Sequence, residues 1–557
     1  MNDKIRIFTL GGLDEDGKNC TVIEINKDIF VVDCGVKYPD KNMPGIDYVI
    51  GDFTYLVENK DRVKAYFLLH GHEDQMGALA YLWDDVPAPI YGSQVTLTMF
   101  KIFTSNIGKN PNRYQLKTVK PTDTFKVAGR EVSFFQTAHN IAQSSGIAIA
   151  TTYGNIVITG DFVVENNASK NYLHDLQAIA RISEKPTLVL MNESVYADRS
   201  GYTAPNYKLT RLIERDVKDA EGRLFIALFN TNFYNIDEVI SLAILTRKKI
   251  IPYDEETKQT IEAMQSCGQL IIPRENYASI DDINRFRAID IIVLLLGSGT
   301  KLYNKIALLA AKENENRQVS LNESDTFIFA CPANSNTEIE ATDALDECYR
   351  AGCHVKGVSK KEFLKMHASE EDLKMMISLF KPKYYIPVKG YYKDLLSNAE
   401  VALSMGINLN HSNVFLLENG LSWLYDEKGA HLFDEKIPHG DIMIDGIGVG
   451  DVQDTVIADR QKLAEGVVVL SAAISSIHHG IVAGPDVQIK GLTTNRDAEI
   501  VSRELSQIFT TVLENHEDDN RYDLNNVRQE VYDRCLRSIR RETGKEPMIL
   551  PLIIEAD

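Results

Sequence analysis

The stretch Phe67–Gly77 constrains the fold of this chain more than any other. The apolar residues from Tyr66 to Leu69 are typical of a buried strand, and the polar run His-Gly-His-Glu-Asp-Gln follows at the end of that strand. A helix-like run begins at Gly77. Two His and one Asp, spaced two residues apart in the loop after a strand, can converge on one point in space. The spacing therefore predicts a loop that binds a metal ion.

Other short apolar segments of the first 165 residues also end at His or Asp. Residues 5–10, 21–25 and 29–33 alternate with turns and predict a β-meander that ends at Asp33. Residues 130–137 predict a strand that ends before His139, and residues 146–150 and 155–161 predict a pair of strands that ends at Asp161. A carboxylate in the position of Asp33 is either a turn former or an orienting group under a site, and its position alone favours the turn.

Five of these strand-end residues have side chains that suit a transition metal. They are His70, His72, Asp74, His139 and Asp161. A single His or Asp at a strand end is usually a cap or a solvated loop residue. Five imidazoles and carboxylates together predict a zinc or manganese site, in the loops where sheets commonly carry their function.

Composition limits the class of protein. A chain of 557 residues predicts about two to four domains, and 44% hydrophobic with 25% charged residues is ordinary for a globular protein. No apolar run approaches the roughly 18–20 residues that span a bilayer, and the N-terminus shows no secretion leader, so we expect a cytoplasmic protein with no membrane partner. Seven Cys without a Cys-x-x-Cys spacing argue against a disulfide framework and a zinc knuckle.

The net charge of −19 argues against a protein that coats nucleic acid. If this chain binds RNA, its basic side chains must be concentrated in a cleft. The motifs described next outweigh the composition.

The order of these residues resembles a known family. Asp33, His70-x-His72-x-Asp74, His139 and Asp161 match the ligand series of the metallo-β-lactamase superfamily, whose motif is His-x-His-x-Asp-His. Here Gln75 stands in the last position of that motif.

Downstream segments narrow the resemblance to the ribonuclease J family of β-CASP nucleases. Residues 190–194 and 199–203 are similar to the acidic motif that opens the β-CASP insertion. Residues 229–233 are similar to the family's Phe-Ala-Ser-Asn segment, residues 373–390 to its last catalytic stretch, and residues 445–451 to its Gly-rich linker. The resemblance covers nearly the whole chain and points to the family's degenerate, less active paralogue.

The resemblance implies an α/β protein. It predicts a metallo-β-lactamase αββα sandwich with an inserted β-CASP α/β domain and a small C-terminal α/β domain. The expected ranges are 1–209 and 356–447 for the two parts of the metallo-β-lactamase domain, 210–355 for the β-CASP domain, 448–465 for a linker and 466–557 for the C-terminal domain. Helix-like stretches that alternate with apolar strands in the inserted region agree with a parallel sheet.

The family has two metal ions side by side, and the residues for only one of them are complete here. By resemblance, His70, His72 and His139 hold the first ion, with Asp161 as the bridge. The second ion would need Asp74, Asp161 and two His, which are replaced by Gln75 and Lys389. An amide is a weak ligand and an ammonium repels a cation. We therefore expect one zinc or manganese ion per site, with the Lys389 ammonium in place of the second ion. The alternative is that Lys389 is a surface lysine.

The remaining family positions are matched unevenly. The resemblance implies catalytic roles for Asp74, Asp161 and His367, of which His367 contacts the scissile phosphate and stabilises the leaving oxygen. Glu193 replaces an orienting Asp, Tyr234 replaces a His and could stack on a base, and Gln143 replaces an Asp that assists proton transfer. The implied substrate contacts are Asn232, Lys365, Met366, His367, Ala368, Ser369 and Lys389.

The function implied by the resemblance is RNA processing and RNA decay. We expect a metal-dependent ribonuclease that degrades RNA 5′ to 3′, with some endonucleolytic cleavage and with activity attenuated by the loss of second-metal ligands. The expected partners are RNA with a 5′-monophosphate, a second copy or a ribonuclease J paralogue, and an RNA-degradation complex. The alternative is a catalytically inert RNA-binding subunit of a complex with an active paralogue. A small-molecule hydrolase of the same superfamily is disfavoured, because small substrates need no β-CASP insertion.

Overall fold

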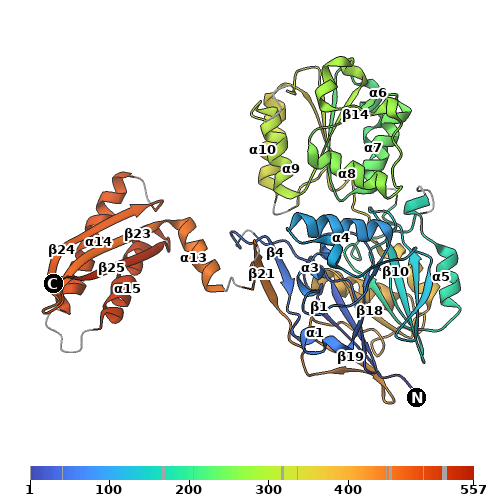
Figure 1. Ribbon diagram of the computed structural model, residues 1–557, viewed down its shortest axis with the longest axis horizontal. Helices are drawn as coiled ribbons and strands as arrows, with labels where there is room; N and C mark the ends of the chain where they lie inside the picture. The colour runs from blue at the N-terminus through green and yellow to red at the C-terminus, as the bar shows by residue number, and fades with distance from the viewer. Residues whose placement is uncertain are drawn as a thin grey trace. The chain divides into compact units, whose positions relative to one another are not determined.

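The computed structural model describes most of the chain (Figure 1). The described residues are 2–40, 42–165, 168, 170–204, 206–314, 319–334, 337–446, 448–450, 454–492, 495–516 and 523–556. They form two compact units, Met1–Tyr38 with Tyr48–Ile442, and Pro39–Asp47 with Met443–Asp557. Part of the predicted linker, residues 451–453, and position 447 of the Gly-rich segment lie outside the described residues.

Two sheets packed face to face build the first part of the larger unit. One sheet has the strand order β20-β19-β1-β2-β3-β5-β6-β7, and the other has the order β18-β12-β11-β10-β9-β8. The strands of the first sheet are β1 (Ile5–Gly11), β2 (Cys20–Ile25), β3 (Asp28–Val32), β5 (Val63–Leu68), β6 (Ile90–Gly92), β7 (Leu116–Thr118), β19 (Ser422–Asp426) and β20 (Gly429–Phe433). Those of the second are β8 (Thr124–Val127), β9 (Arg130–Gln136), β10 (Ser145–Thr151), β11 (Gly154–Ile158), β12 (Thr187–Glu193) and β18 (Tyr384–Val388).

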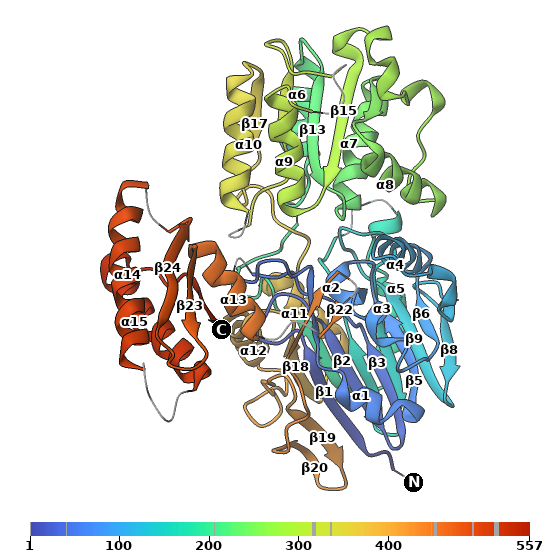
Figure 2. The same cartoon turned by 60° about the vertical axis from the view of Figure 1, so that its left-hand side comes forward.

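The core of this sandwich lies between the two sheets. Phe30 and Phe67 of the first sheet pack in one buried cluster with Phe134, Ile149 and Met191 of the second. Helices α5 (Leu176–Ser183), α11 (Glu370–Phe380) and α12 (Tyr392–Ser404) bury apolar side chains against the outer face of the second sheet. Figure 1 shows helix α4 (Gln94–Asn106) across one end of the sandwich, where Figure 2 also shows it. The αββα architecture is as predicted.

The loop after β5 turns into a helix earlier than the sequence pattern predicts. Helix α2 (Glu73–Met76) begins inside the polar stretch, and α3 (Leu79–Leu82) follows as a separate helix. The N–H groups of Cys34 and Val36 donate to the carbonyls of Gln75 and Glu73. The N–H of Leu79, which would continue α2 onto the Gln75 carbonyl, donates instead to the carbonyl of Cys34, so α2 ends after one turn. This places the His-rich loop firmly against the end of β3.

The inserted part of the larger unit is built on a parallel sheet with the strand order β14-β15-β13-β16-β17. Its strands are β13 (Leu224–Phe229), β14 (Lys249–Pro252), β15 (Ile291–Gly297), β16 (Thr326–Phe329) and β17 (His354–Gly357). The helices are α6 (Thr210–Asp219), α7 (Phe233–Leu245), α8 (Glu255–Ser266), α9 (Gly299–Ala310) and α10 (Glu338–Arg350). Separate apolar clusters lie on the two faces of the sheet, which explains why β13 and β15 are apolar almost throughout. The predicted parallel sheet is confirmed.

The smaller unit contains a three-stranded sheet with the order β24-β23-β25 and two long helices. Its elements are α13 (Asp454–Glu465), β23 (Val467–Ser475), β24 (Ile481–Lys490), α14 (Asn495–Asn515), α15 (Leu524–Thr543) and β25 (Met548–Ala556). The buried residues of α14 and α15 share one cluster with every second residue of β23. In the part of the chain that the structure describes, no helix combines the length and the apolar character needed to cross a bilayer.

Candidate metal centre

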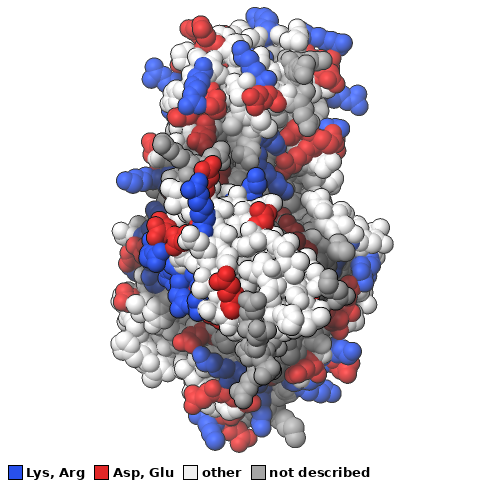
Figure 3. Space-filling view, turned by 90° about the vertical axis from the view of Figure 1, so that its left-hand side faces the viewer, with Lys and Arg blue, Asp and Glu red and all other residues white. Residues whose placement is uncertain are grey.

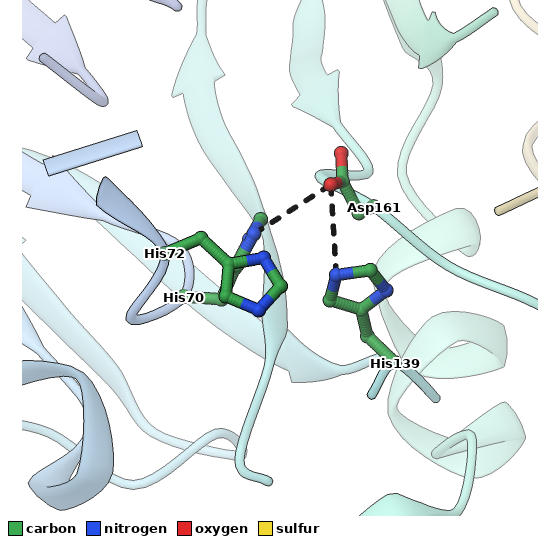
Figure 4. Close-up of side chains that lie close together, drawn as sticks. All are labelled: His70, His72, His139 and Asp161. Atoms are coloured by element: carbon green, nitrogen blue, oxygen red, sulfur yellow. Dashed lines mark ion pairs between the residues drawn. The ribbon is translucent and has the colours of Figure 1, made fainter. Parts of the chain in front are cut away.

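Four side chains from three strand-end loops meet at one edge of the sandwich (Figure 4). His70 and His72 follow β5, His139 follows β9 and Asp161 follows β11. One ligand atom from each of the four lies within 4.8 Å of the others. The Nε2 atoms of His70 and His139 both lie 3.6 Å from Oδ2 of Asp161. The sequence predicted all four residues for the first ion, and the structure brings them together.

The hydrogen bonds of these imidazoles fit a bound cation. Among the described residues, neither ring nitrogen of His70 nor Nε2 of His139 has a hydrogen-bond partner, although all three are buried. Nδ1 of His139 lies 2.7 Å from the carbonyl of Met366, and Nε2 of His72 lies 3.3 Å from the carbonyl of Thr231. A carbonyl only accepts hydrogen bonds, so Nδ1 of His139 and Nε2 of His72 carry the ring protons. Nε2 of His139 and Nδ1 of His72 are left with free lone pairs that can bind a metal ion. Three imidazoles and a carboxylate suit zinc or manganese.

Burial keeps the imidazoles neutral, which is the form that binds a metal. Desolvation lowers the pKa of His70 to about 3, against the pull of Asp161. Desolvation and the neighbouring His70 also hold the pKa of His139 well below its ordinary value. The cluster therefore offers neutral nitrogen donors at physiological pH.

Lys389 lies beside this cluster and contacts two carboxylates. Its Nζ donates to Oδ2 of Asp161 at 2.5 Å and to Oδ2 of Asp74 at 3.1 Å. The Lys389 side chain is only 11% exposed, so it is not a surface lysine. Burial alone would lower the pKa of Lys389, but the carboxylates of Asp161 and Asp74 raise it above its ordinary value. The ammonium therefore stays charged between the two acids.

The other side chains of this half also donate to Asp74. The amides of Gln75 and Asn19 each donate to Oδ2 of Asp74 at 3.1 Å, the oxygen that also accepts from Lys389. Asp74 was predicted as a metal ligand, but the structure places it against these three donors rather than in the group of His70, His72, His139 and Asp161. Its Oδ2 is thus committed to protein partners.

The backbone at Lys389 has an unusual conformation. Its φ of +61° lies in the left-handed region, which side chains other than Gly rarely adopt. The Lys389 carbonyl accepts a hydrogen bond from Ser194 at 3.1 Å, and Gly390 forms bridges with Leu13 and Glu15. These contacts hold the strained residue in place and direct its side chain to the carboxylates.

His367 lies at the edge of the same cluster. Its Nδ1 is 2.6 Å from Oε2 of Glu193 and 3.8 Å from Oδ2 of Asp161. Oε1 of Glu193 accepts from the N–H groups of Phe162 and Ala368 at 2.7 and 3.2 Å, so this carboxylate is rigidly held. Burial disfavours the imidazolium, but the charge of Glu193 raises the pKa of His367 above its ordinary value. Such a histidine can donate a proton to an oxyanion.

The remaining predicted substrate contacts differ in accessibility. Lys365 is exposed, and Asn232 caps α7 by accepting from the N–H of Asn235 at 3.3 Å. Met366 and Ala368 are buried side chains. Ser369 is 1% exposed, and its hydroxyl lies 2.7 Å from that of Thr203. The side chains of Met366, Ala368 and Ser369 therefore pack inside the protein, while Lys365 faces the solvent.

Tyr234 and Gln143, which replace residues of the family pattern, contact neighbouring elements of the fold. Tyr234 is 7% exposed and packs edge to face against Tyr172 and Tyr207, so the prediction that it stacks on a base is wrong. Its ring completes the aromatic core under α7. Oε1 of Gln143 accepts from the N–H of Val95 at 3.3 Å and thus holds the start of α4.

Asp33 has a larger role than that of the turn former which its position in the sequence favours. Its buried Oδ1 accepts from the N–H of Leu69 at 2.9 Å, directly before the His-rich loop. Burial raises the pKa of Asp33 well above its ordinary value. Its place in the ligand order of the superfamily was the one signal for an orienting role. Asn19, which contacts Asp74, carried no signal in the sequence.

Comparisons with known proteins agree with this arrangement. Residues 13–193 match the Metallo-beta-lactamase superfamily, residues 221–344 match the Ribonuclease J beta-CASP domain, and residues 455–556 match the Ribonuclease J C-terminal domain. Ribonuclease J 2 of Staphylococcus epidermidis strain ATCC 35984 is 31% identical over 100% of this chain and 99% of its own length. Ribonuclease J 2 of Staphylococcus aureus strain NCTC 8325 is 32% identical with the same coverage.

A solved structure shares the fold alone. The protein of unknown function from Enterococcus faecalis V583 superposes with a TM-score of 0.52 at 13% identity, over 76% of this chain and all of the other. The full-length similarity to the staphylococcal relatives and the three matched domains carry the assignment. This chain belongs to the ribonuclease J family of metal-dependent ribonucleases.

Proposed function

We propose that this chain is a ribonuclease of attenuated activity that works with one divalent ion. It degrades and matures RNA 5′ to 3′, with endonucleolytic cleavage as a second mode. The observation that carries the proposal is the position of the Lys389 ammonium, 2.5 Å from Asp161 and 3.1 Å from Asp74. These two carboxylates would otherwise share the second ion.

The two halves of the site have different roles in this proposal. A zinc or manganese ion held by His70, His72, His139 and Asp161 would lower the pKa of a water and stabilise charge on the phosphoryl oxygens. Lys389 balances the charge of Asp74 and Asp161. His367, oriented by Glu193, donates a proton to the leaving oxygen.

Attenuation follows from the chemistry of an ammonium. A lysine provides a single positive charge and donates hydrogen bonds, so it neutralises carboxylates and binds phosphate oxygens. It has no vacant coordination position and cannot bind a water as a Lewis acid does. Charge stabilisation remains in this half of the site, while activation of water depends on one ion alone.

We also propose an RNA partner with a 5′-monophosphate and an assembly with a second copy or a ribonuclease J paralogue, within a cytoplasmic RNA-degradation complex. Leu550, Leu552 and Ile554 of β25 are 43%, 50% and 64% exposed, and they lie on the face opposite Ile549 and Ile553, which are buried in the cluster with α14 and α15. Figure 3 shows a broad area with few charged side chains on the viewed side of the molecule. An exposed apolar sheet face supports an interface. Sedimentation of Leu552→Glu should show a smaller species than the wild type.

The test of activity uses purified protein, Mn²⁺ or Zn²⁺, and 5′-monophosphorylated RNA. We expect one equivalent of metal per chain and slow, metal-dependent release of nucleotides. The combined variant His70→Ala with His72→Ala should lose both. Two equivalents of tightly bound metal would overturn the one-ion proposal.

The second candidate function is an inert RNA-binding subunit of a complex with an active paralogue. It is favoured by the engagement of Oδ2 of Asp74 by three protein donors, and by the internal hydrogen bond of the Ser369 hydroxyl. Equal, background-level cleavage by the wild type and the double His variant would support this candidate, provided that both proteins bind RNA.

A further inference from the structure

Tyr196 and Arg199 form a stacked pair next to His367. The guanidinium carbon of Arg199 lies 4.4 Å from the centroid of the Tyr196 ring. The ring of Tyr196 in turn meets the ring of His367 at a centroid distance of 5.8 Å and an angle of 85°. The three side chains thus form a continuous series that leads from the proton donor to an exposed cation. Of these three side chains, the proposed mechanism uses only His367.

The pair is held in place by the backbone around it. The Tyr196 hydroxyl accepts from the N–H of Lys365 at 3.3 Å, within the loop that carries His367. The N–H of Arg199 donates to the carbonyl of Tyr196 at 3.0 Å, and the carbonyl of Arg199 accepts from Glu370 at 2.9 Å. The turn is therefore fixed against the first residue of α11 before any ligand binds. A fixed surface loses less conformational entropy on binding than a mobile one.

The charge of Arg199 is not neutralised by a neighbouring acid. Among residues with described positions, no carboxylate lies within 4.0 Å of its guanidinium. The nearby acids of α11, Glu370 and Glu371, instead pair with Lys374 at 2.7 and 2.8 Å. In a chain with a net charge of −19, an unpaired arginine beside the site attracts a polyanion locally.

The chemistry of the pair fits single-stranded RNA. A planar guanidinium stacks on a nucleobase with one face while it stacks on an aromatic ring with the other, and its N–H groups bind phosphate. Tyr196 is half-buried, so its role is to support the guanidinium and to contribute aromatic surface. The buried Tyr234 cannot serve as a stacking residue, whereas the ring of Tyr196 is partly exposed and contacts the ring of His367.

We propose that Tyr196 and Arg199 form a stacking platform for the nucleobase next to the phosphate bound at His367. The platform is sequence-tolerant, because every base has a π-face. The inference rests on the proposed function for the position of the phosphate at His367. It assigns substrate-positioning roles to Tyr196 and Arg199, which take no part in proton transfer during the reaction.

The test measures RNA binding without cleavage. A 5′-monophosphorylated, fluorescently labelled RNA of ten nucleotides is titrated with the full chain in the presence of a chelator, and its anisotropy is followed. We expect Arg199→Ala and Tyr196→Ala each to weaken binding about ten-fold, the effect of losing one stacked base. Arg199→Lys should recover only part of the affinity, and Tyr196→Phe most of it. Replacing one base near the 5′ end with an abasic site should remove the difference between the wild type and Arg199→Ala.

Matched controls separate this effect from charge and folding. Arg215→Ala removes a 92% exposed arginine of α6, and Tyr349→Ala removes a 58% exposed tyrosine of α10. Affinities of Arg199→Ala and Tyr196→Ala within two-fold of these controls would overturn the platform. Arg199→Lys guards against misfolding, because it keeps the charge and the length of the side chain. Absence of nuclease activity with intact, platform-dependent binding would count against the proposed function and leave the platform standing.

Discussion

The two halves of the site differ in how their polar atoms are satisfied. In the His half, which consists of His70, His72, His139 and Asp161, both ring nitrogens of His70 and Nε2 of His139 have no hydrogen-bond partner among the described residues, and they face the carboxylate of Asp161. In the Lys half, a single oxygen of Asp74 accepts from Lys389, Gln75 and Asn19. Buried polar atoms without partners are costly, and a cation bound from outside would satisfy these nitrogens. The second half contains its cation as part of the chain.

Removal of the His half should have the largest effect. His70→Ala with His72→Ala takes away two of three nitrogen donors, and we expect metal affinity and RNA cleavage to fall by more than about 100-fold. Metal analysis after dialysis and a cleavage assay measure both quantities. His411→Ala, an exposed histidine, is the control. Retention of a full equivalent of metal by the double variant would refute the assignment of the His half.

Removal of the Lys389 ammonium should destabilise the protein. Lys389→Met leaves the buried Asp161 and the half-buried Asp74 without their charge partner, and we expect a loss of about 3 kcal/mol in the metal-free protein. Chemical denaturation followed by fluorescence measures the change, with Lys117→Met on the exposed surface as the control. An unchanged midpoint would mean that Lys389 contributes no net stability.

Conversion of the Lys half into a His half should increase the activity. Gln75→His with Lys389→His restores the two nitrogen donors that the family pattern requires, and we expect a second equivalent of metal and about a ten-fold rise in kcat/KM. Each single substitution should give a smaller rise in kcat/KM, because a single added nitrogen donor holds the second ion weakly. If the double variant binds one equivalent and cleaves like the wild type, the losses at these two positions do not explain the attenuation.

A buried ion pair outside the site should contribute less to the free energy of unfolding than Lys389 does, and it serves as a reference for that residue. Arg130 donates to both oxygens of Asp3 at 2.9 and 2.7 Å. Burial raises the pKa of Asp3, but the bonds from Arg130 and Thr152 outweigh it and lower the pKa to about 2. Since this value lies below the ordinary 3.8, the stabilisation is complete above about pH 4 and is lost as the pH falls to about 2.

We expect this pair to contribute about 2 kcal/mol to the free energy of unfolding at neutral pH. Denaturation of the wild type and of Asp3→Asn between pH 2 and 7 isolates the contribution, which should vanish at the acidic end. A difference that does not depend on pH would show that the carboxylate charge of Asp3 is not its source. The value then calibrates the larger loss expected for Lys389→Met.

The sequence predicted the framework of the site better than its details. The four residues of the His half follow strand ends, and because strand ends meet at one edge of a sandwich, their convergence could be predicted. The position of Lys389 followed from the family pattern. The burial of Tyr234 and the contact of Gln143 with Val95 depend on packing between elements distant in the sequence, which local patterns do not encode. Tyr196 was missed for the same reason, since its partner His367 lies 171 positions away in the chain.

The left-handed backbone at Lys389 has a consequence for the divergence of such enzymes. The contacts of this residue with Ser194, and of Gly390 with Leu13 and Glu15, involve only main-chain atoms and do not depend on which side chain position 389 carries. A histidine and a lysine there would leave the main chain from the same point toward the same carboxylates. Paralogues that differ in the number of ions they bind can therefore arise by exchange of side chains, while the fold that presents them stays unaltered.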